Sequence, residues 1–461
     1  MSNSIKFSSL DLQPTLLSNL VDIGYEEMTL VQAETLPQMI GGSDVLARAK
    51  TGSGKTAAFG LGLLNKLDAT SFRTQALVLC PTRELADQIA KEIRRLARGI
   101  LNVKILTLCG GVPLRPQLAS LQHSPHIIVG TPGRVLKHLG KETVKLADLE
   151  TLVLDEADRM LDMGFSEELD AILKFVPKDR QTLLFSATYA ESIAAVSKRV
   201  QRSPVKVDVT DDEQPAQIMQ FWCSVTRENR NTDLVRALRA WGGELNLVFC
   251  NTKVDCAEVA NYLRSQNIVA VALHGDLDQS ERTEVLVRFA NRSASVLIAT
   301  DVAARGLDVK DLDAVFNYEL PKQAEIYVHR IGRTARAGKR GVAVSLVGPR
   351  EERRWQEIDE LLPDANPTKC GIPDAKRSAD PLSPSMTTIQ ISGGRKNKLR
   401  PGDLLGVLTA DGGVPGDSVG SIDLFDTYSY VAVRNAQTPK ALRQLAKRPI
   451  KGRMYRALVR K

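Results

Sequence analysis

The sequence predicts an α/β protein with two parallel-sheet domains in tandem, followed by a small α+β domain. The chain has 461 residues, enough for about three domains of ordinary size. Short continuous apolar runs alternate twice with helical patterns, which is typical of parallel sheets covered by helices on both faces. The last segment, residues 386–461, follows a different order, β-α-β-β-α-β.

The expected elements fall in three blocks separated by two linkers. The first domain, residues 1–208, has strand candidates at 44–49, 75–81, 103–111, 126–132, 151–158 and 181–188. A polar linker is expected at 209–217. The second domain, 218–362, has strand candidates at 244–252, 267–275, 294–301, 314–321 and 341–347. A linker with five prolines is expected at 363–385. In the last domain we expect strands at 387–394, 419–425, 428–435 and 453–461, and helices at 401–410 and 438–447.

The composition indicates a soluble protein of the cytoplasm. Hydrophobic residues make up 43% of the chain and charged residues 25%. No apolar run approaches the roughly 18 residues of a transmembrane helix, so no membrane partner is expected. The first residues do not resemble a signal peptide. The six cysteines form no CxxC pair and are expected to be reduced thiols.

The positive charge is concentrated at the C-terminal end of the chain. Residues 386–461 contain 14 Lys and Arg against 5 Asp, a net charge of +9. The remaining 48 basic and 49 acidic residues give −1. Such an asymmetry indicates a module that binds a polyanion, although a solvated basic surface is an equal alternative on charge alone.

A glycine-rich loop, AKTGSGKT, spans Ala49 to Thr56 between an apolar strand and an Ala- and Leu-rich helix. This context is that of a phosphate-binding loop, in which backbone N–H groups and the helix N-terminus surround phosphate oxygens. Lys55 can reach the β- and γ-phosphates, and the Thr56 hydroxyl can bind Mg²⁺. Ala49 replaces the usual first glycine. The candidate phosphate contacts are Thr51, Gly52, Ser53, Gly54 and Lys55.

Three carboxylates follow the apolar run Thr151–Leu154. Asp155 ends a predicted buried strand, where an acid can hold Mg²⁺ through a water molecule. Glu156 can orient or deprotonate the water that attacks the γ-phosphate. Asp158 is a candidate N-cap or a bridge to a neighbouring motif. The alternative is that the whole cluster only caps a helix.

Together these motifs resemble those of the DEAD-box RNA helicases. DEAD at 155–158 and AKTGSGKT are accompanied, in order, by PTRELA (81–86), GG (110–111), TPGR (131–134), SAT (186–188), VFCNT (248–252), QSER (279–282), TDVAARGLD (300–308) and HRIGRTAR (329–336). The match covers residues 1 to about 360. The whole chain also resembles the DbpA subfamily, whose C-terminal RNA-recognition-like domain acts on large-subunit ribosomal RNA. The resemblance implies two tandem RecA-like domains that use ATP and Mg²⁺.

The resemblance assigns further residues to ATP. Gln32 would pair with adenine, and Tyr25 would stack on or beside the base, with Phe7 as the upstream aromatic residue; Met28 replaces a usual Pro. Asp308 would contact the ribose. Arg330, Arg333 and Arg336 recur every three residues and are expected on or near one helical face. Arg333 and Arg336 would act as arginine fingers on the γ-phosphate. Ala335 replaces a usual Gly.

The remaining motifs are implied to bind RNA or to couple it to ATP. Contacts to phosphates and sugars would make this binding independent of base sequence. Ser186, Thr188 and His329 would link the state of ATP to contacts between the lobes. The implied RNA contacts are Thr82, Arg83, Gly111, Thr131, Pro132, Arg134, Thr252, Arg282, Thr300 and Gly306.

The C-terminal pattern and charge favour an RNA-recognition-like fold. Tyr428 and Tyr430 stand where such folds carry base-stacking aromatic residues; contact with a base and packing on the sheet are equal alternatives. Arg395, Lys396, Lys398 and Arg400 are candidates for gripping structured RNA, as is the tail 447–461.

The sequence therefore predicts an ATP-dependent RNA helicase that acts by closure of its two lobes. The expected partners are large-subunit ribosomal RNA and pre-ribosomal particles. Two alternatives remain open: an ATP-gated RNA clamp or scaffold with slow hydrolysis, and a DNA helicase.

Overall fold

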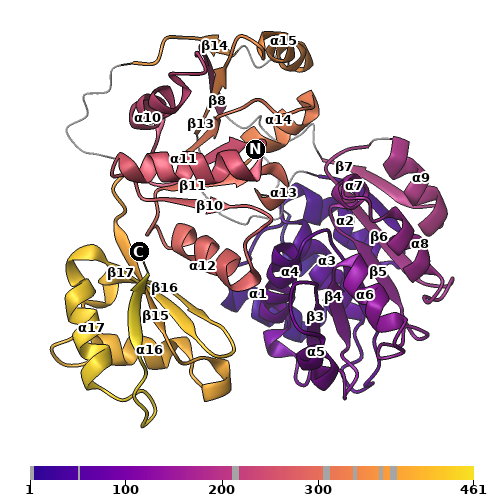
Figure 1. The fold of residues 1–461 in the computed structure, drawn as a ribbon. Helices are drawn as coiled ribbons and strands as arrows, with labels where there is room; N and C mark the ends of the chain where they lie inside the picture. The colour runs from indigo at the N-terminus through magenta and orange to yellow at the C-terminus, as the bar shows by residue number, and fades with distance from the viewer. Residues whose placement is uncertain are drawn as a thin grey trace. The chain divides into compact units, whose positions relative to one another are not determined.

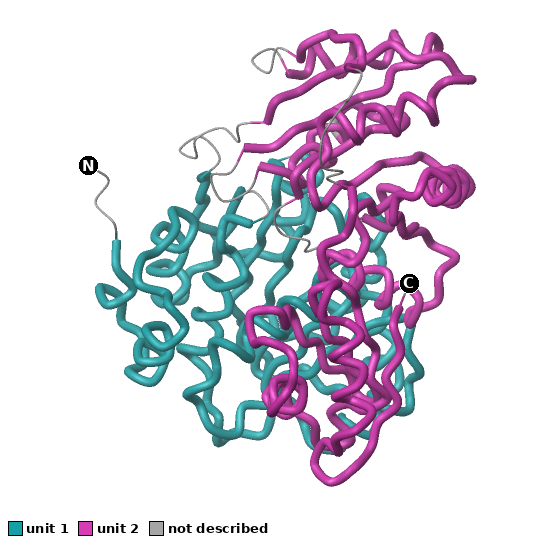
Figure 2. Tube along the Cα trace, turned by 90° about the vertical axis from the view of Figure 1, so that its left-hand side faces the viewer, with its two compact units in different colours: residues 1–215, 306–308 teal, residues 216–305, 309–461 magenta. Residues whose placement is uncertain are grey.

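The computed structural model describes residues 5–49, 52–189, 191–209, 218–304, 312–335, 340–362, 367–373 and 382–460. The chain divides into two compact units (Figure 2). One comprises residues 1–215 and 306–308, and the other comprises residues 216–305 and 309–461.

The first unit is built on a sheet of seven parallel strands (Figure 1). Their order is β3-β4-β2-β5-β6-β1-β7, so the chain crosses over repeatedly between neighbours. The strands are β1 (Val45–Arg48), β2 (Ala76–Leu79), β3 (Ile105–Leu108), β4 (Ile127–Gly130), β5 (Thr151–Leu154), β6 (Gln181–Ser186) and β7 (Val205–Asp208). Because all pairings are parallel, the carboxyl ends of these strands share one edge.

Helices cover both faces of this sheet. Alternate strand residues enter two separate cores, as Val78 and Leu77 illustrate. The first core packs α1 (Pro14–Asp22), α2 (Leu30–Ile40), α3 (Lys55–Lys66) and α4 (Arg83–Leu96). The second packs α6 (Pro132–Leu139), α7 (Ala157–Asp162), α8 (Ser166–Leu173) and α9 (Glu191–Val200). The remaining helices of this unit are α5 (Leu114–Ser120), η1 (Phe7–Ser9) and η2 (Ala97–Gly99).

The second unit begins with another parallel sheet of seven strands, ordered β10-β11-β9-β12-β13-β8-β14. The strands are β8 (Ile218–Ser224), β9 (Asn246–Cys250), β10 (Ala270–Leu273), β11 (Val296–Thr300), β12 (Ala314–Asn317), β13 (Gly341–Val347) and β14 (Thr368–Lys369). The helices are α10 (Arg230–Trp241), α11 (Lys253–Ser265), α12 (Gln279–Ala290), α13 (Asp301–Ala304), α14 (Ala324–Ile331) and α15 (Glu352–Leu361).

The unit ends with an antiparallel sheet ordered β16-β17-β15-β18. Its elements are β15 (Met386–Ile391), η3 (Arg395–Asn397), α16 (Pro401–Thr409), η4 (Gly416–Ser418), β16 (Val419–Leu424), β17 (Ser429–Arg434), η5 (Asn435–Gln437), α17 (Thr438–Lys447) and β18 (Ala457–Arg460). One face packs on α16 and α17 through Ile389, Ile391, Val431 and Val433.

The expected fold class is confirmed: two parallel α/β sheets in tandem and a small α+β sheet with β-α-β-β-α-β order. Strands β7, β8 and β14 were not predicted from the sequence. In the described part of the chain, no helix is both long and apolar enough to span a membrane.

Candidate functional site

The glycine-rich loop joins β1 to α3. Gly52 and Gly54 have φ of 95° and 96°, a left-handed region that favours glycine. A Cβ on Gly54 would also lie 2.7 Å from the Gln32 amide nitrogen and 2.9 Å from the Thr29 hydroxyl. Lys55 begins α3, and its buried ammonium donates to the Ala49 carbonyl at 2.7 Å. This is the cradle of N–H groups and one cation that a phosphate group requires; Thr51 lies outside the described residues.

The segment before α2 is tied to this loop. Thr29 Oγ1 donates to the Ser53 carbonyl at 2.8 Å, and Gln32 Nε2 donates to the Gly54 carbonyl at 3.2 Å. Gln32 Oε1 accepts from the Thr29 backbone N–H at 2.9 Å. Gln32 therefore lies at the loop, with both ends of its amide engaged. Its pairing with adenine stays a prediction and requires these bonds to exchange.

Tyr25 contacts α4 rather than the glycine-rich loop. Its hydroxyl donates to Glu92 at 3.0 Å, its ring lies under Arg95, and the buried Phe7 ring is 6.3 Å away. Stacking of Tyr25 on a nucleotide base also stays a prediction.

Asp155 and Glu156 follow β5 and are both buried. Burial raises the pKa of Asp155 to about 6, although the nearby Lys55 ammonium opposes this shift. A buried acid that is costly to ionise gains from a cation, which fits the predicted binding of Mg²⁺ by Asp155. Thr56 follows Lys55 on the first turn of α3. Among the described residues, no group of three or more His, Cys, Asp and Glu could hold a metal ion alone, so the phosphates would have to supply ligands.

Glu156 is held in a strained position. Its φ is 52°, which is costly for a residue with a side chain. Its carboxylate forms a buried ion pair with Arg159 at 2.8 Å. The sequence reasoning missed Arg159, although the stretch TLVLDEADRM contains it. The spacing of three residues on a short helix was the available signal.

Asp158 joins the acidic motif to the SAT motif. Its Oδ2 accepts from the Ala187 backbone N–H at 3.0 Å and from the Thr188 hydroxyl at 3.4 Å. Ser186 ends β6, and its hydroxyl accepts from the Thr188 N–H at 3.2 Å. A change at the acidic motif can therefore move the SAT segment directly. Coupling of these residues to lobe closure stays a prediction.

The predicted RNA contacts of the first unit follow three neighbouring strands. Thr82 caps α4 after β2, accepting from the Leu85 N–H at 3.3 Å. Arg83 follows, and its buried Nη1 has no hydrogen-bond partner among the described residues. Gly111 is exposed after β3 with φ of 74°. Thr131 and Pro132 begin α6 after β4.

Arg134 on α6 is fixed by a buried network. Its guanidinium donates to Gln117 Oε1 at 2.8 Å and to the Val112 carbonyl at 3.0 Å. Gln117 Oε1 also lies 2.9 Å from His138 Nε2, which must carry the proton, and His138 Nδ1 lies 2.8 Å from the Thr143 hydroxyl. Burial and the adjacent Arg134 cation lower the pKa of His138. Gln117 and His138 were not predicted, since neither stands in a recognised motif.

The strand order divides the shared edge of this sheet into two halves. The predicted RNA contacts follow β3, β4 and β2, which are neighbours. The glycine-rich loop, the acidic residues and SAT follow β1, β5 and β6, which are also neighbours. The sequence places these motifs far apart, and the fold brings them to one edge.

In the second unit, the predicted RNA contacts again follow strand ends. Thr252 caps α11 after β9, accepting from the Asp255 N–H at 3.1 Å. Thr300 ends β11, and its hydroxyl accepts from the Ala303 N–H at 3.4 Å. Arg282 on α12 donates to the Ala303 carbonyl at 2.8 Å, joining α12 to the segment after β11. Gly306 and Asp308 lie outside the described residues.

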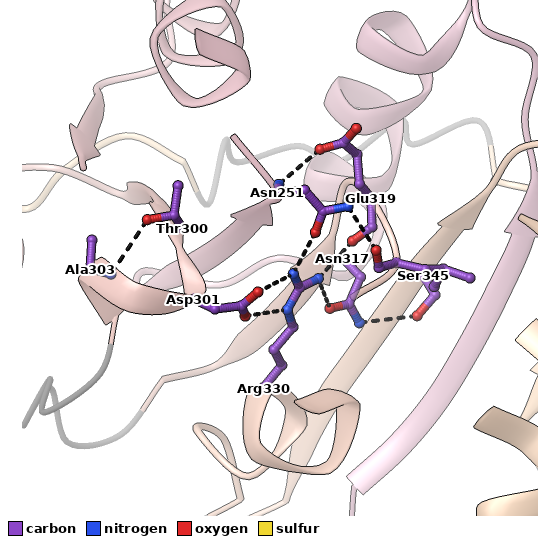
Figure 3. A network of polar contacts seen from close by, with 9 residues as sticks. Asn251, Thr300, Asp301, Ala303, Asn317, Glu319, Arg330 and Ser345 are labelled. Carbon is purple, nitrogen blue, oxygen red and sulfur yellow. Dashed lines mark hydrogen bonds and ion pairs between the residues drawn. The ribbon is translucent and has the colours of Figure 1, made fainter. Parts of the chain in front are cut away.

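The expectation that Arg330 and Arg333 share a helical face is wrong, because α14 ends at Ile331. Arg330 points into the second unit, where it is 1% exposed (Figure 3). Its guanidinium pairs with both Asp301 oxygens at 2.6 and 2.8 Å and donates to Asn251 at 2.9 Å, to Asn317 at 3.2 Å and to the Glu319 carbonyl at 2.6 Å. Arg330 therefore holds four segments together.

The other residues of this motif lie near the end of α14. His329 is on its last turn, and Arg333 follows the helix and is buried. Arg336 lies outside the described residues. Ala335, which replaces a usual Gly, has φ of 56°, so the position keeps the left-handed backbone that favours glycine.

The two aromatic residues predicted to contact RNA bases on the C-terminal sheet differ in their exposure. Tyr430 is 1% exposed, whereas Tyr428 is half-buried and stacks on Phe425 at 4.9 Å. Arg395, Lys396 and Lys398 are exposed beside η3. These basic residues are therefore available to a polyanion. Tyr430 can contact a base only if the residues that bury it move away.

Three family models match the chain over these same regions. The DEAD/DEAH box helicase family matches residues 29–196, and the helicase conserved C-terminal domain matches residues 229–338. The DbpA RNA binding domain matches residues 388–458. The ATP-dependent RNA helicase DbpA of Escherichia coli is 52% identical over 98% of both chains.

The chain is a DEAD-box ATP-dependent RNA helicase of the DbpA type. The helicase is also 44% identical to the DEAD-box ATP-dependent RNA helicase CshA of Bacillus cereus, over 77% of this chain and 67% of the relative. Among solved structures, it resembles S. cerevisiae Dbp5 bound to RNA and ADP BeF3, with a TM-score of 0.72 and 29% identity. That match covers 80% of this chain and 96% of the other. Use of ATP and binding of RNA by the helicase follow from this membership.

Proposed function

We propose that this helicase remodels large-subunit ribosomal RNA during ribosome assembly, in cycles in which ATP and RNA together close its two lobes. The C-terminal domain would select the RNA. The observation that carries the proposal is the single sheet edge whose two halves hold the candidate ATP residues and the candidate RNA residues and meet at the neighbouring strands β2 and β5. Within the ATP half, the bond from Thr188 to Asp158 joins the SAT motif to the acidic motif. A ligand on either half of this edge can shift the same conformational equilibrium.

In the proposed ATP step, Lys55 and the loop N–H groups hold the phosphates. Thr56 and Asp155 would hold Mg²⁺, which neutralises charge on the phosphate oxygens. Glu156 orients or deprotonates the attacking water, and Arg159 holds the Glu156 carboxylate in place beforehand. Arg333 and Arg336 would reach the γ-phosphate only in the closed state. The remaining nucleotide contacts in the proposal are Tyr25, Gln32, Thr51, Gly52, Ser53, Gly54 and Asp308.

In the proposed RNA step, the two lobes touch phosphates and sugars and therefore do not read sequence. Arg83 supports this assignment, because its guanidinium is 26% exposed and, within the described part of the chain, is held by a single ion pair, from Nε to Asp87 at 3.7 Å. Its Nη1 makes no hydrogen bond among the described residues and is free to donate to a phosphate oxygen after a small movement. Selection of ribosomal RNA would come from the C-terminal domain, with its net charge of +9 and exposed Arg395, Lys396 and Lys398. Pre-ribosomal particles would be the partners.

The proposal places the helicase in the cytoplasm, where it would meet assembling ribosomes. The unpaired cysteines support a reducing compartment, since all six are free thiols and five are buried.

Crosslinking in cells with a trapped variant tests the RNA target. Glu156→Gln keeps the shape of the side chain but cannot act as a base, so it should stay on RNA with ATP bound. Glu167→Gln, on the exposed first turn of α8, is the matched control. We expect the Glu156 variant to enrich large-subunit ribosomal RNA over the wild type and the control. Equal enrichment of messenger and ribosomal RNA would contradict the proposed target. Loss of ATP binding by the variant would contradict the role of Glu156.

A further inference from the structure

Two of the six cysteines meet at the edge of the second parallel sheet. Cys223 lies in β8 and is 1% exposed, whereas Cys370 directly follows the edge strand β14 and is half-buried. Their Sγ atoms are 3.7 Å apart, which is close to van der Waals contact. The two residues are separated by 147 positions in the sequence, so only the fold brings their thiols together.

The register of the two strands suits a covalent bond between these thiols. Lys369 lies opposite Trp222 in a parallel pairing, so the next pair along the strands is Cys370 and Cys223. The Cys370 N–H continues the ladder by donating to the Trp222 carbonyl at 3.1 Å. Neighbouring strands are about 4.8 Å apart, within the range of about 4.4–6.8 Å that a disulfide requires between Cα atoms. Both side chains pack in the same core, so they point to the same face of the sheet.

The two thiols differ in their access to solvent. A small oxidant can reach Cys370, because its side chain is only half-buried, whereas Cys223 is enclosed. Burial and the adjacent Cys370 thiol raise the pKa of Cys223 to about 12. Cys223 therefore stays protonated and unreactive at neutral pH until an electrophilic sulfur forms beside it. The other four cysteines are buried as well, so Cys370 is the most accessible thiol of the six.

We propose that Cys223 and Cys370 form an oxidation site, at which hydrogen peroxide closes a disulfide that locks β14 onto β8. The Cys370 thiolate attacks one peroxide oxygen, the O–O bond breaks, and the departing hydroxide takes up the proton that the thiol released. The Cys223 sulfur then attacks the resulting sulfenic acid, the S–O bond breaks, and the second hydroxide takes the Cys223 proton. The thiols lose two electrons, and the peroxide is reduced to two water molecules. A dithiol reductant reverses the step by thiol–disulfide exchange.

A covalent bond would matter at this position because β14 is a minimal strand. It has two residues, both exposed, and forms the edge of its sheet. The Lys369 ammonium lies 4.6 Å from the centroid of the Trp222 ring, and Arg236 donates to the Ile372 carbonyl at 3.1 Å. Such a short edge strand opens at a low cost in free energy, so β14 can leave the sheet in the reduced protein. A disulfide opposes this opening, because it ties the end of the strand to a buried residue.

Mass spectrometry of the folded full chain tests the bond. The reduced protein is treated with hydrogen peroxide in slight excess, the remaining thiols are blocked with N-ethylmaleimide, and the chain is digested without reductant. We expect a linked pair of peptides that contain Cys223 and Cys370, lighter by two hydrogens than the sum of the two. Oxidation of Cys370 to a sulfinic acid while Cys223 stays free would overturn the proposal, because the buried thiol would then have failed to reach the sulfenic acid.

Limited proteolysis tests the lock. Trypsin can cleave after Lys369 only when β14 has left the sheet, so the initial rate of this cleavage reports the population of the open strand. Oxidation should slow the cleavage at least about tenfold in the wild type, and dithiothreitol should restore it. An unchanged rate in protein that carries the disulfide would contradict the proposed lock.

Serine variants show whether the two thiols cause this effect. Cys370→Ser and Cys223→Ser should each cleave at the same rate before and after peroxide treatment. Cys256→Ser, which removes a buried thiol on α11, is the matched control and should respond as the wild type does. RNA-stimulated ATP hydrolysis in the reduced state reports that each variant is folded. Because Cys370 is half-buried, Cys370→Ser removes little of the core and keeps the test valid if Cys223→Ser does not fold.

Slowing of the cleavage by peroxide that persists in Cys370→Ser would overturn the proposal, since another residue would then be responsible. None of these outcomes bears on the ATP and RNA assignments above, because those assignments do not use Cys223 or Cys370.

Discussion

Two residues at the candidate ATP site are held in conformations or environments that lower the stability of the folded protein. Asp155 is a buried acid, and Glu156 combines a left-handed backbone with a buried ion pair. Such costs are typical of residues that function requires, because packing alone would favour neutral side chains. The pH dependence of the free energy of unfolding measures how much the burial of Asp155 destabilises the protein.

Asp155→Asn should stabilise the ligand-free protein while abolishing ATP hydrolysis. The pKa of Asp155, about 6, lies above its ordinary value of 3.8, so the folded state binds the proton more tightly than the unfolded state. The stability gained in this way is present at low pH and lost as the pH rises through 6. Asn stays neutral and can still accept the Glu156 N–H. We expect a gain on the order of 1–3 kcal/mol at pH 7.5.

Denaturant unfolding at two pH values checks this prediction. The advantage of Asp155→Asn should shrink by about 1 kcal/mol between pH 7.5 and pH 5, where the wild-type acid is mostly protonated. The exposed Asp148→Asn is the control. An advantage that does not change with pH would mean that the raised pKa is not its cause.

Gln117→Leu should weaken RNA binding without impairing chemistry. The variant removes the oxygen that accepts from both Arg134 and His138. Loss of a hydrogen bond from a charged donor costs about 1.5–3 kcal/mol, of which part should appear as a higher RNA concentration for half-maximal ATPase activity. The maximal rate and ATP affinity should stay normal. The exposed Gln122→Leu serves as control. A lower maximal rate with unchanged RNA dependence would argue against a positioning role.

At the scale of elements, the pattern of apolar residues predicted most strands and helices, because these depend on neighbouring residues in the sequence. The central strands are continuous apolar runs, and both parallel sheets and the C-terminal β-α-β-β-α-β order were found from them. Strand β7, VKVD, lies at the edge of its sheet and is half polar. It therefore lacks the continuous apolar run by which a buried strand is recognised in a sequence. Similarly, β8 has mostly half-buried residues.

Contacts between distant segments could not be predicted in the same way. The spacing of Arg330, Arg333 and Arg336 suggested a helical face, but α14 ends before Arg333. The partners of Arg330 lie on three other segments, which local spacing does not reveal. Motifs identified the residues of the candidate ATP site, whereas Arg159, Gln117 and His138 were found only through their contacts in the structure.

Arg330→Met should destabilise the second unit by about 3–5 kcal/mol, because Asp301 and two Asn side chains would lose a buried partner. All three tryptophans, Trp222, Trp241 and Trp355, belong to this unit, so their fluorescence reports its unfolding alone. The exposed Arg350→Met is the control. Unchanged unfolding of the Arg330 variant would contradict a structural role for this arginine.

At the scale of the whole molecule, sequence-blind and selective functions are assigned to different parts of the chain. Residues 1–385 carry every motif for ATP and RNA phosphates but a net charge of only −1, and residues 386–461 carry +9. Truncation after residue 385 keeps Leu382, which packs in a core of the second unit. The truncated protein is therefore expected to fold and to hydrolyse ATP with enough RNA of any sequence.

The most direct measurement compares ATPase activation by large-subunit ribosomal RNA fragments and by scrambled RNA of equal length, for the full chain and for residues 1–385. The account predicts that the full chain prefers the ribosomal fragments and that truncation removes this preference. It also predicts a lower apparent affinity for all RNA, because the positive charge and its counterion release are lost. A truncated protein that keeps the full preference for ribosomal RNA would contradict the assignment of targeting to the C-terminal domain.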